Sequence, residues 1–256
     1  MTRAAAAALL LLATPALAED GCRLAAQGSA AVAAVRDGRT LALADGRTVR
    51  LAGLEVTGAA AAALNGLVGR PLRLEAPSAE PDRYGRLVAF AYAGGEARSV
   101  QQMLLDQGLA RVAARVGSKP CADVLLRAER AARAAQRGLW ADPNFAPLSP
   151  DNGARLRAEL GRFTIVQGKV LSVRDSGSTI YVNFGPRWTR DFSVIILRRN
   201  QRIFKDAGLE PKALEGRLIR VRGVLEQRRG PVIEADVPEQ IELADEAMRN
   251  AQEMRP

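Results

Sequence analysis

The chain contains no histidine among its 256 residues. This absence excludes Ser-His and Cys-His catalytic pairs and removes a common zinc ligand. Any hydrolytic chemistry must therefore depend on carboxylates, arginines and a metal ion that prefers oxygen ligands. Lysine is scarce too, because arginine supplies all but four of the 37 basic residues. With a formal net charge of +9, this composition favours a polyanionic partner, since arginine binds phosphate through paired hydrogen bonds.

Long apolar segments are also lacking, apart from residues 4–12, which follow Arg3. A membrane-spanning helix needs about 20 apolar residues, and this run is shorter. Together with Ala16 and Ala18, which fit the small-residue cleavage pattern, it has the pattern of a secretory signal peptide over residues 1–18. We expect export to the periplasm or the medium, and no stable membrane insertion once the signal is removed.

Cysteine is rare, since the chain holds only Cys22 and Cys121. In an exported protein an even number of cysteines favours a disulfide. Two buried thiols are the alternative interpretation. A bridge that closes a loop of about 100 residues adds roughly 4–5 kcal/mol in the chain-entropy model.

The first half of the chain has the pattern of a small barrel. Two Asp-Gly turns separate apolar stretches within residues 28–56, which predicts a three-stranded meander. The elements expected next are a helix over 58–68, strands over 71–76 and 86–94, a helix from 99 that Gly108 ends, and a helix over 121–140. This order predicts a five-stranded barrel of the oligonucleotide-binding type with added helices.

The second half repeats this order without a repeated sequence. Prolines and asparagines over 142–160 predict a linker. The elements expected next are strands over 161–177, 178–185 and 189–197, a helix over 198–208, and strands over 217–230 and 231–243. We therefore expect a mainly β protein with some α-helix, built from two five-stranded barrels over 19–141 and 161–243. A polar tail over 244–256 follows.

Four stretches carry a resemblance to a known family: RLAGLEVTG at 50–58, DRYGRLVAFAY at 82–92, LLDQGLARV at 104–112 and RGLW at 137–140. Together they resemble the staphylococcal nuclease-like family, also called thermonuclease-like, over about residues 35–140. The resemblance implies a phosphodiesterase that uses calcium, three acids and two arginines. Calcium takes carboxylate oxygens, a further carboxylate activates water, and arginines stabilise the charged phosphoryl oxygens.

The resemblance places the two phosphate-binding arginines on Arg50 and Arg86, and both are present. One metal-binding aspartate falls on Arg39 and the general-base glutamate falls on Gly58, so both acids are missing. The second metal-binding aspartate falls on Glu55. The resemblance therefore implies a phosphate site whose metal and water machinery is damaged, with Glu55 as the remaining acid.

Two alternatives stay open at this point. A shifted register would make Asp37 a metal ligand, and Glu75, Glu80 or Asp82 would serve as substitute acids. In a purely structural interpretation the site arginines pair with Glu55 and other acids, and Arg39 makes such a pair in place of the metal.

Aromatic residues interleaved with arginines give a second set of candidates. In the first half, Arg83 and Tyr84 lie next to Arg86. In the second half, six of the eleven aromatic residues fall between positions 163 and 204. Stacking aromatics and basic grooves are typical of single-strand binders with this fold. The candidate contacts there are Tyr181, Arg187, Trp188 and Arg190, whereas Phe184, Phe192 and Phe204 are expected in the core.

The favoured interpretation is an exported, nuclease-like protein that binds single-stranded nucleic acid or another polyanion, with cleavage lost or weak and no cofactor. One alternative is an active calcium-dependent phosphodiesterase that uses Arg50, Arg86 and Glu55. Another is a non-catalytic scaffold of the cell envelope with a protein partner.

Overall fold

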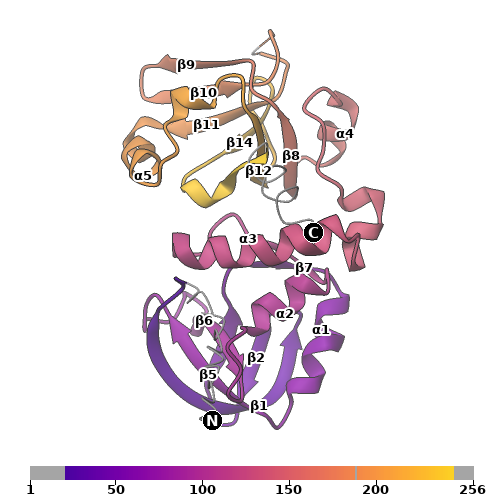
Figure 1. Cartoon of the computed structure of the whole chain (residues 1–256), viewed down its shortest axis with the longest axis vertical. Coiled ribbons are helices and arrows are strands. Elements are labelled where there is room, and N and C mark those ends of the chain that lie inside the picture. Colours follow the sequence, from indigo (N-terminus) through magenta and orange to yellow (C-terminus); the bar gives the residue numbers. More distant parts are fainter. Residues whose placement is uncertain (1–20, 188, 245–256) are drawn as a thin grey trace, which may run out of the picture.

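The computed structural model describes residues 21–187 and 189–244. The predicted signal peptide over 1–18, Trp188 and nearly all of the predicted polar tail lie outside the described residues. Two lobes stack along the long axis, and helix α3 (Lys119–Ala134) crosses between them (Figure 1). Each lobe has its own hydrophobic core. No helix in the described part of the chain has the length and apolar character needed to cross a bilayer.

The first lobe is a closed barrel of five strands with the neighbour order β1-β2-β3-β6-β5. These strands are β1 (Ala25–Asp37), β2 (Thr40–Leu43), β3 (Thr48–Leu51), β5 (Pro71–Ala76) and β6 (Arg86–Ala93). The long strand β1 pairs with β5 through its first part and with β2 through its second part, and this closes the barrel. Strands β3 and β6 are parallel. The predicted five-stranded barrel is confirmed.

One predicted strand is wrong, because the segment expected to end the meander divides at Gly53. Strand β3 ends at Leu51, and β4 (Leu54–Val56) leaves the barrel to pair with β7 (Ala110–Val112). Gly53 has φ +72°, and a Cβ there would lie 2.9 Å from Leu125 Cδ1. The turn therefore requires glycine, for both its backbone conformation and its packing. The break leaves Arg50 on the barrel and moves Glu55 onto a separate ribbon.

Helices cover the barrel: α1 (Ala59–Leu64) with the 3₁₀ turn η1 (Asn65–Leu67), then α2 (Val100–Asp106) and α3. Buried Gln101 fixes α2 on β6, since its amide donates to the Ala89 carbonyl and accepts from the Ala91 N–H. The predicted helix over 121–140 is wrong at its end. Helix α3 stops at Ala134 and the 3₁₀ turn η2 (Gly138–Ala141) follows.

Cys22 and Cys121 form a disulfide, as predicted. The bond joins the segment before β1 to the first turn of α3 across a sequence separation of 99 residues. It therefore ties the start of the first lobe to the helix that lies between the lobes.

Residues 142–160 were expected to be a linker, but they contain ordered structure. They form the 3₁₀ turn η3 (Pro143–Phe145) and helix α4 (Gly153–Ala158), and Leu148 makes backbone hydrogen bonds to β8 (Phe163–Lys169). Asn152 caps α4 by accepting from the Arg155 N–H. The prolines and glycine of this segment are typical of loops, so the sequence pattern did not predict the short helix.

The second lobe consists of two sheets in the strand orders β13-β14-β11-β10-β9 and β15-β12-β8. Its further strands are β9 (Ser172–Ser176), β10 (Thr179–Asn183), β11 (Ser193–Leu197), β12 (Leu218–Val224), β13 (Glu226–Gln227), β14 (Pro231–Glu234) and β15 (Ile241–Leu243). Its further helical elements are η4 (Arg198–Asn200), α5 (Gln201–Asp206), η5 (Pro211–Leu214) and η6 (Pro238–Gln240).

A second closed barrel is not confirmed. The strand predicted over 161–177 is interrupted at Val170 and Leu171, so β8 pairs with β12 while β9 pairs with β10. The strand predicted over 217–230 is likewise interrupted at Leu225, which separates β12 from β13. The parallel pair in this lobe is β11 with β14, which corresponds in position along the chain to β3 with β6.

The outer face of the small sheet β15-β12-β8 packs on α3. Ile165 of β8 lies in one apolar cluster with Ala132, Leu139 and Trp140 of the first half. Beside this cluster, Arg222 of β12 is fully buried and bonded to Glu129 of α3. The contact between the lobes therefore combines apolar packing with buried charge.

Candidate functional site

A pocket of about 460 Å³ opens at the end of the first barrel. Its lining includes four arginines and one aspartate, namely Arg50, Asp82, Arg83, Arg86 and Arg115. The parallel register sets Arg50 beside Val88, so Arg50 and Arg86 lie on the same face of neighbouring strands. The structure therefore brings together the two arginines that the resemblance selected.

Arg86 is held by Asp82. Its Nε and Nη2 atoms donate to Asp82 Oδ2 at 2.9 and 2.8 Å, and its backbone N–H donates to Oδ1 at 3.0 Å. The hydrogen bond from the Arg86 guanidinium lowers the pKa of Asp82 to about 2. Asp82, considered above as a substitute acid, is thus the acid that orients Arg86.

Arg50 differs from Arg86, because no acid in the described part of the chain forms an ion pair or a hydrogen bond with its side chain. Partial burial lowers its pKa, and the neighbouring charges of Arg39 and Arg86 lower it further. Glu55 and Asp82 offset part of this effect. A guanidinium stays protonated at neutral pH. Arg50 is therefore a cation that lacks a paired anion.

The guanidinium of Arg39 interacts with the oxygens that would coordinate a metal ion in this part of the site. Its Nη1 atom donates to the Leu54 carbonyl at 2.9 Å and lies 3.4 Å from Glu55 Oε1. Asp37 caps its own turn by accepting from the Arg39 N–H at 2.8 Å. Within the described residues no three acidic or cysteine side chains are grouped as metal ligands. These residues do not fit the calcium ion that the family resemblance implies.

Gly58 precedes helix α1 and has φ −58°, a conformation that any residue adopts. A Cβ at this position would meet nothing within 4 Å. The backbone therefore does not require glycine here, and its conformation is compatible with a glutamate at this position.

Tyr84 projects from the rim of the pocket, with 67% of its surface exposed. The guanidinium carbons of Arg83 and Arg86 lie 5.2 and 4.9 Å from its ring centroid. At these distances both cations interact favourably with the ring. Both neighbours predicted from the sequence therefore join the same site.

Sequence reasoning missed Arg115, which also lines this pocket. It follows β7 in a loop without a recognisable motif, and it forms an ion pair with Asp236 of the second lobe. Asp236 also accepts a hydrogen bond from Asn200 of η4 at 3.4 Å. No sequence pattern links these residues, because the contact depends on how the lobes meet.

The second-lobe candidates lie elsewhere. Arg187 and Arg190 belong to the β10–β11 loop and line a separate pocket of about 340 Å³, where Asp191 accepts from the Arg187 N–H at 2.9 Å. Tyr181 lies within β10, paired with Arg174 and Ile195 in the neighbouring strands. Trp188 is outside the described residues. The core prediction is confirmed for three phenylalanines, which are buried: Phe184, Phe192 and Phe204.

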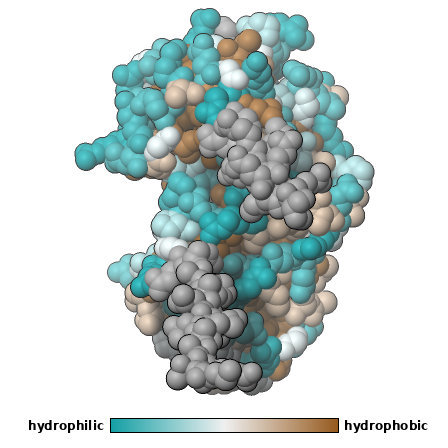
Figure 2. All heavy atoms as spheres, in the orientation of Figure 1, coloured by the Kyte–Doolittle hydropathy of each residue, from teal (hydrophilic) through white to brown (hydrophobic). Residues whose placement is uncertain are grey.

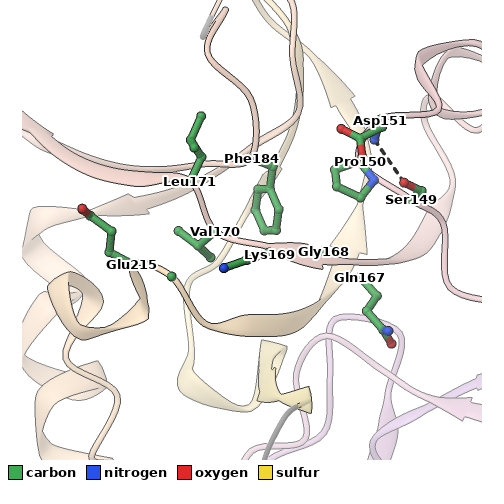
Figure 3. A pocket seen from close by; sticks show the side chains of 11 residues that line it. Ser149, Pro150, Asp151, Gln167, Gly168, Lys169, Val170, Leu171, Phe184 and Glu215 are labelled. Carbon is green, nitrogen blue, oxygen red and sulfur yellow. Dashed lines mark hydrogen bonds between the residues drawn. The ribbon is translucent and has the colours of Figure 1, made fainter.

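A larger pocket of about 730 Å³ lies where residues 149–151 meet the bend between β8 and β9. Figure 3 shows Phe184 and Gln167 on opposite sides of β8, with Glu215 some way from both. Among the described residues of its lining, Lys169 is cationic and Asp151 and Glu215 are acidic. This pocket lacks the converging cations of the first-lobe pocket.

A comparison with models of known protein families finds a match to part of the first lobe. Residues 58–142 match the family model described as Staphylococcal nuclease homologue. The matched segment contains Asp82 and Arg86, whereas Arg39, Arg50 and Glu55 precede it. None of the curated proteins compared with the chain matches it.

Proposed function

Because the first lobe is a staphylococcal nuclease-like domain, we propose that it binds the phosphodiester backbone of nucleic acid through Arg50 and Arg86 without metal-dependent cleavage. The observation that carries this proposal is the state of Arg50. It is a partly buried cation with no acidic partner among the described residues, set beside Arg86 in a pocket. A phosphate anion supplies the missing charge, and two guanidinium groups bind its oxygens.

Arg39 supports the loss of metal chemistry. A guanidinium already takes the Leu54 carbonyl and the Glu55 carboxylate, so a divalent cation would be repelled from these oxygens. The positive charge of Arg39 also adds to the field around Arg50. In this proposal Arg39 acts as a fixed cation that favours phosphate binding but activates no water.

The test combines binding and cleavage on single-stranded DNA and RNA with calcium, with magnesium and with chelator. We expect no cleavage in any condition and binding that weakens steeply as salt is raised. Arg50→Ala should weaken binding and reduce the salt dependence by roughly 0.7 in log K per log salt, the value for one phosphate contact on a single strand. Metal-dependent cutting that Arg50→Ala abolishes would instead establish an active phosphodiesterase.

Arg36→Ala is a matched control, because Arg36 is an exposed arginine of β1 outside the pocket lining. Arg36→Ala removes the same charge at a position outside the pocket. It should therefore change binding much less than Arg50→Ala. Equal effects of the two substitutions would mean that net charge, and not this pocket, accounts for the affinity. Absence of any salt-dependent binding would favour a scaffold with a protein partner.

We also propose that the protein is exported. The disulfide between Cys22 and Cys121 supports an oxidising compartment. Fractionation of cells into cytoplasm, periplasm and medium, followed by detection of the protein, tests this proposal. Recovery in the cytoplasm with both thiols reduced would contradict it.

A further inference from the structure

The pocket of the first lobe borders the second lobe directly. Arg115 lines the pocket and pairs with Asp236, and Asp236 accepts from Asn200. Asn200 ends the 3₁₀ turn η4, so Arg199 is its immediate neighbour in the chain. The arginines of η4 therefore directly precede Asn200 in the chain, and Asn200 is linked to the pocket residue Arg115 through Asp236.

The cations on this path are only partly neutralised. Arg50, Arg83 and Arg199 have no acidic partner in the described part of the chain. Arg198 and Arg202 have exposed side chains and lie 3.5 and 3.6 Å from Asp175 and Asp206. A second group of available arginines thus lies beyond Arg115.

The relative position of the lobes does not depend on the Arg115–Asp236 pair alone. The buried bonds of Arg222 to Glu129 and the apolar cluster around Trp140 also join them. Figure 2 shows an indentation on the left side between the lobes, where the visible surface is mostly hydrophilic. These contacts between the lobes therefore fix the position of η4 relative to the pocket.

From this arrangement we infer that one single-stranded nucleic acid binds both lobes, running from the Arg50–Arg86 pocket past Arg115 to Arg199 and Arg202. The inference rests on the proposed function of the pocket and extends it. Several phosphates spaced along one chain match arginines spaced along one path, and the exposed Tyr84 ring offers a surface beside a base. A short ligand would reach the pocket alone.

The β10–β11 loop is excluded from this path by its position. It lies at one end of β11 (Ser193–Leu197), whereas η4 follows the other end. Five residues of strand separate the two ends by about 13–17 Å. Because η4 is the end that meets the pocket side, Arg187 serves as a matched control on the same lobe.

The experiment compares two probes in the presence of chelator: 5′-phosphorylated dT2 followed by NMR titration, and fluorescein-labelled dT12 followed by anisotropy. The inference predicts that Arg199→Ala weakens dT12 binding about threefold to fivefold, as expected for one exposed ion pair. The double variant Arg199→Ala/Arg202→Ala should weaken it by about tenfold or more. Both variants should leave dT2 binding unchanged, and Arg187→Ala should affect neither probe.

The outcomes separate the two proposals. If Arg50→Ala weakens both probes while the η4 variants change neither, the inference is overturned and the proposed function stands. If Arg187→Ala weakens dT12 as much as Arg199→Ala, the path through η4 is wrong. If Arg50→Ala weakens neither probe, the proposed function fails and this inference fails with it. Circular dichroism and thermal unfolding of each variant establish that it is folded.

Discussion

Arg222 of β12 and Glu129 of α3 form a bidentate ion pair across the two lobes. Their bonds are 2.9 Å from Nη1 to Oε2 and 3.1 Å from Nη2 to Oε1, and neither side chain is exposed. Arg222 also donates to the Val112 carbonyl at 3.0 Å and to Glu242. One fully buried guanidinium thus joins β7, α3 and β15.

Removing one partner of this pair should destabilise the protein strongly. Arg222→Met leaves Glu129 buried without its main counter-charge, and a broken buried pair costs about 3–5 kcal/mol. Urea unfolding measures the free energy of unfolding of Arg222→Met, Glu129→Gln and the double variant. We expect the double variant to cost much less than the sum of the two single variants. Single costs below about 1 kcal/mol would show that the pair contributes little.

Acid should weaken the contact between the lobes through Glu242. Burial alone would raise its pKa, but the charges of Arg222, Arg133, Arg220 and Arg130 outweigh burial and lower the pKa from 4.5 to about 2. A carboxyl whose pKa is depressed by folding contributes stability above the unfolded value of 4.5. That contribution disappears as the pH falls through about 2.

Glu242→Gln tests this pH dependence. The variant should be less stable than wild type at neutral pH and should lose less stability between pH 4.5 and 2. Urea midpoints measured across this range give the comparison. Glu226→Gln is the control, because Glu226 pairs with Arg228 on an exposed hairpin. Identical profiles for wild type and Glu242→Gln would contradict the assignment.

The disulfide should supply a large share of the stability of the first lobe. Its loop spans 99 residues, and the chain-entropy model gives about 4–5 kcal/mol for a loop of this size. The variant Cys22→Ser/Cys121→Ser should therefore unfold at a markedly lower urea concentration. Wild type in reducing agent should match that variant, and the variant itself should not respond to the reducing agent. A loss below about 1 kcal/mol would mean that native contacts already restrict this segment.

Arg39→Asp should create a weak calcium site. The change removes the guanidinium that takes the Leu54 carbonyl and Glu55, and it adds a carboxylate beside them. Calorimetric titration should show binding in the millimolar range, typical of sites with few ligands. Adding Gly58→Glu, for which the backbone has room, should introduce calcium-dependent cleavage of single-stranded DNA.

Arg36→Asp is the matched control for Arg39→Asp, because it makes the same charge change on the exposed part of β1. If Arg36→Asp and Arg39→Asp bind calcium equally, the attraction is non-specific and the role given to Arg39 is wrong. Calcium binding by the wild-type protein with similar affinity would lead to the same conclusion.

The sequence by itself determined the local elements and the chemistry available to them. The Asp-Gly turns predicted the hairpins of the first barrel, because few residue pairs adopt that turn. The family resemblance selected Arg50 and Arg86, and two cysteines in a chain predicted to be exported favoured the disulfide. The absence of histidine restricted hydrolysis to acids and arginines. These features depend on neighbouring residues, so a linear pattern contains them.

Only the tertiary structure decided which charges are neutralised. Arg86 is satisfied by Asp82, four positions away, whereas Arg50 has no such acid among the described residues. Arg222 finds Glu129 across 93 positions, and Arg115 finds Asp236 across 121. No linear pattern predicts such pairs, because they depend on how the two lobes pack against α3. For the same reason we place the proposed nucleic-acid path beside η4, and not at the aromatic β10–β11 loop.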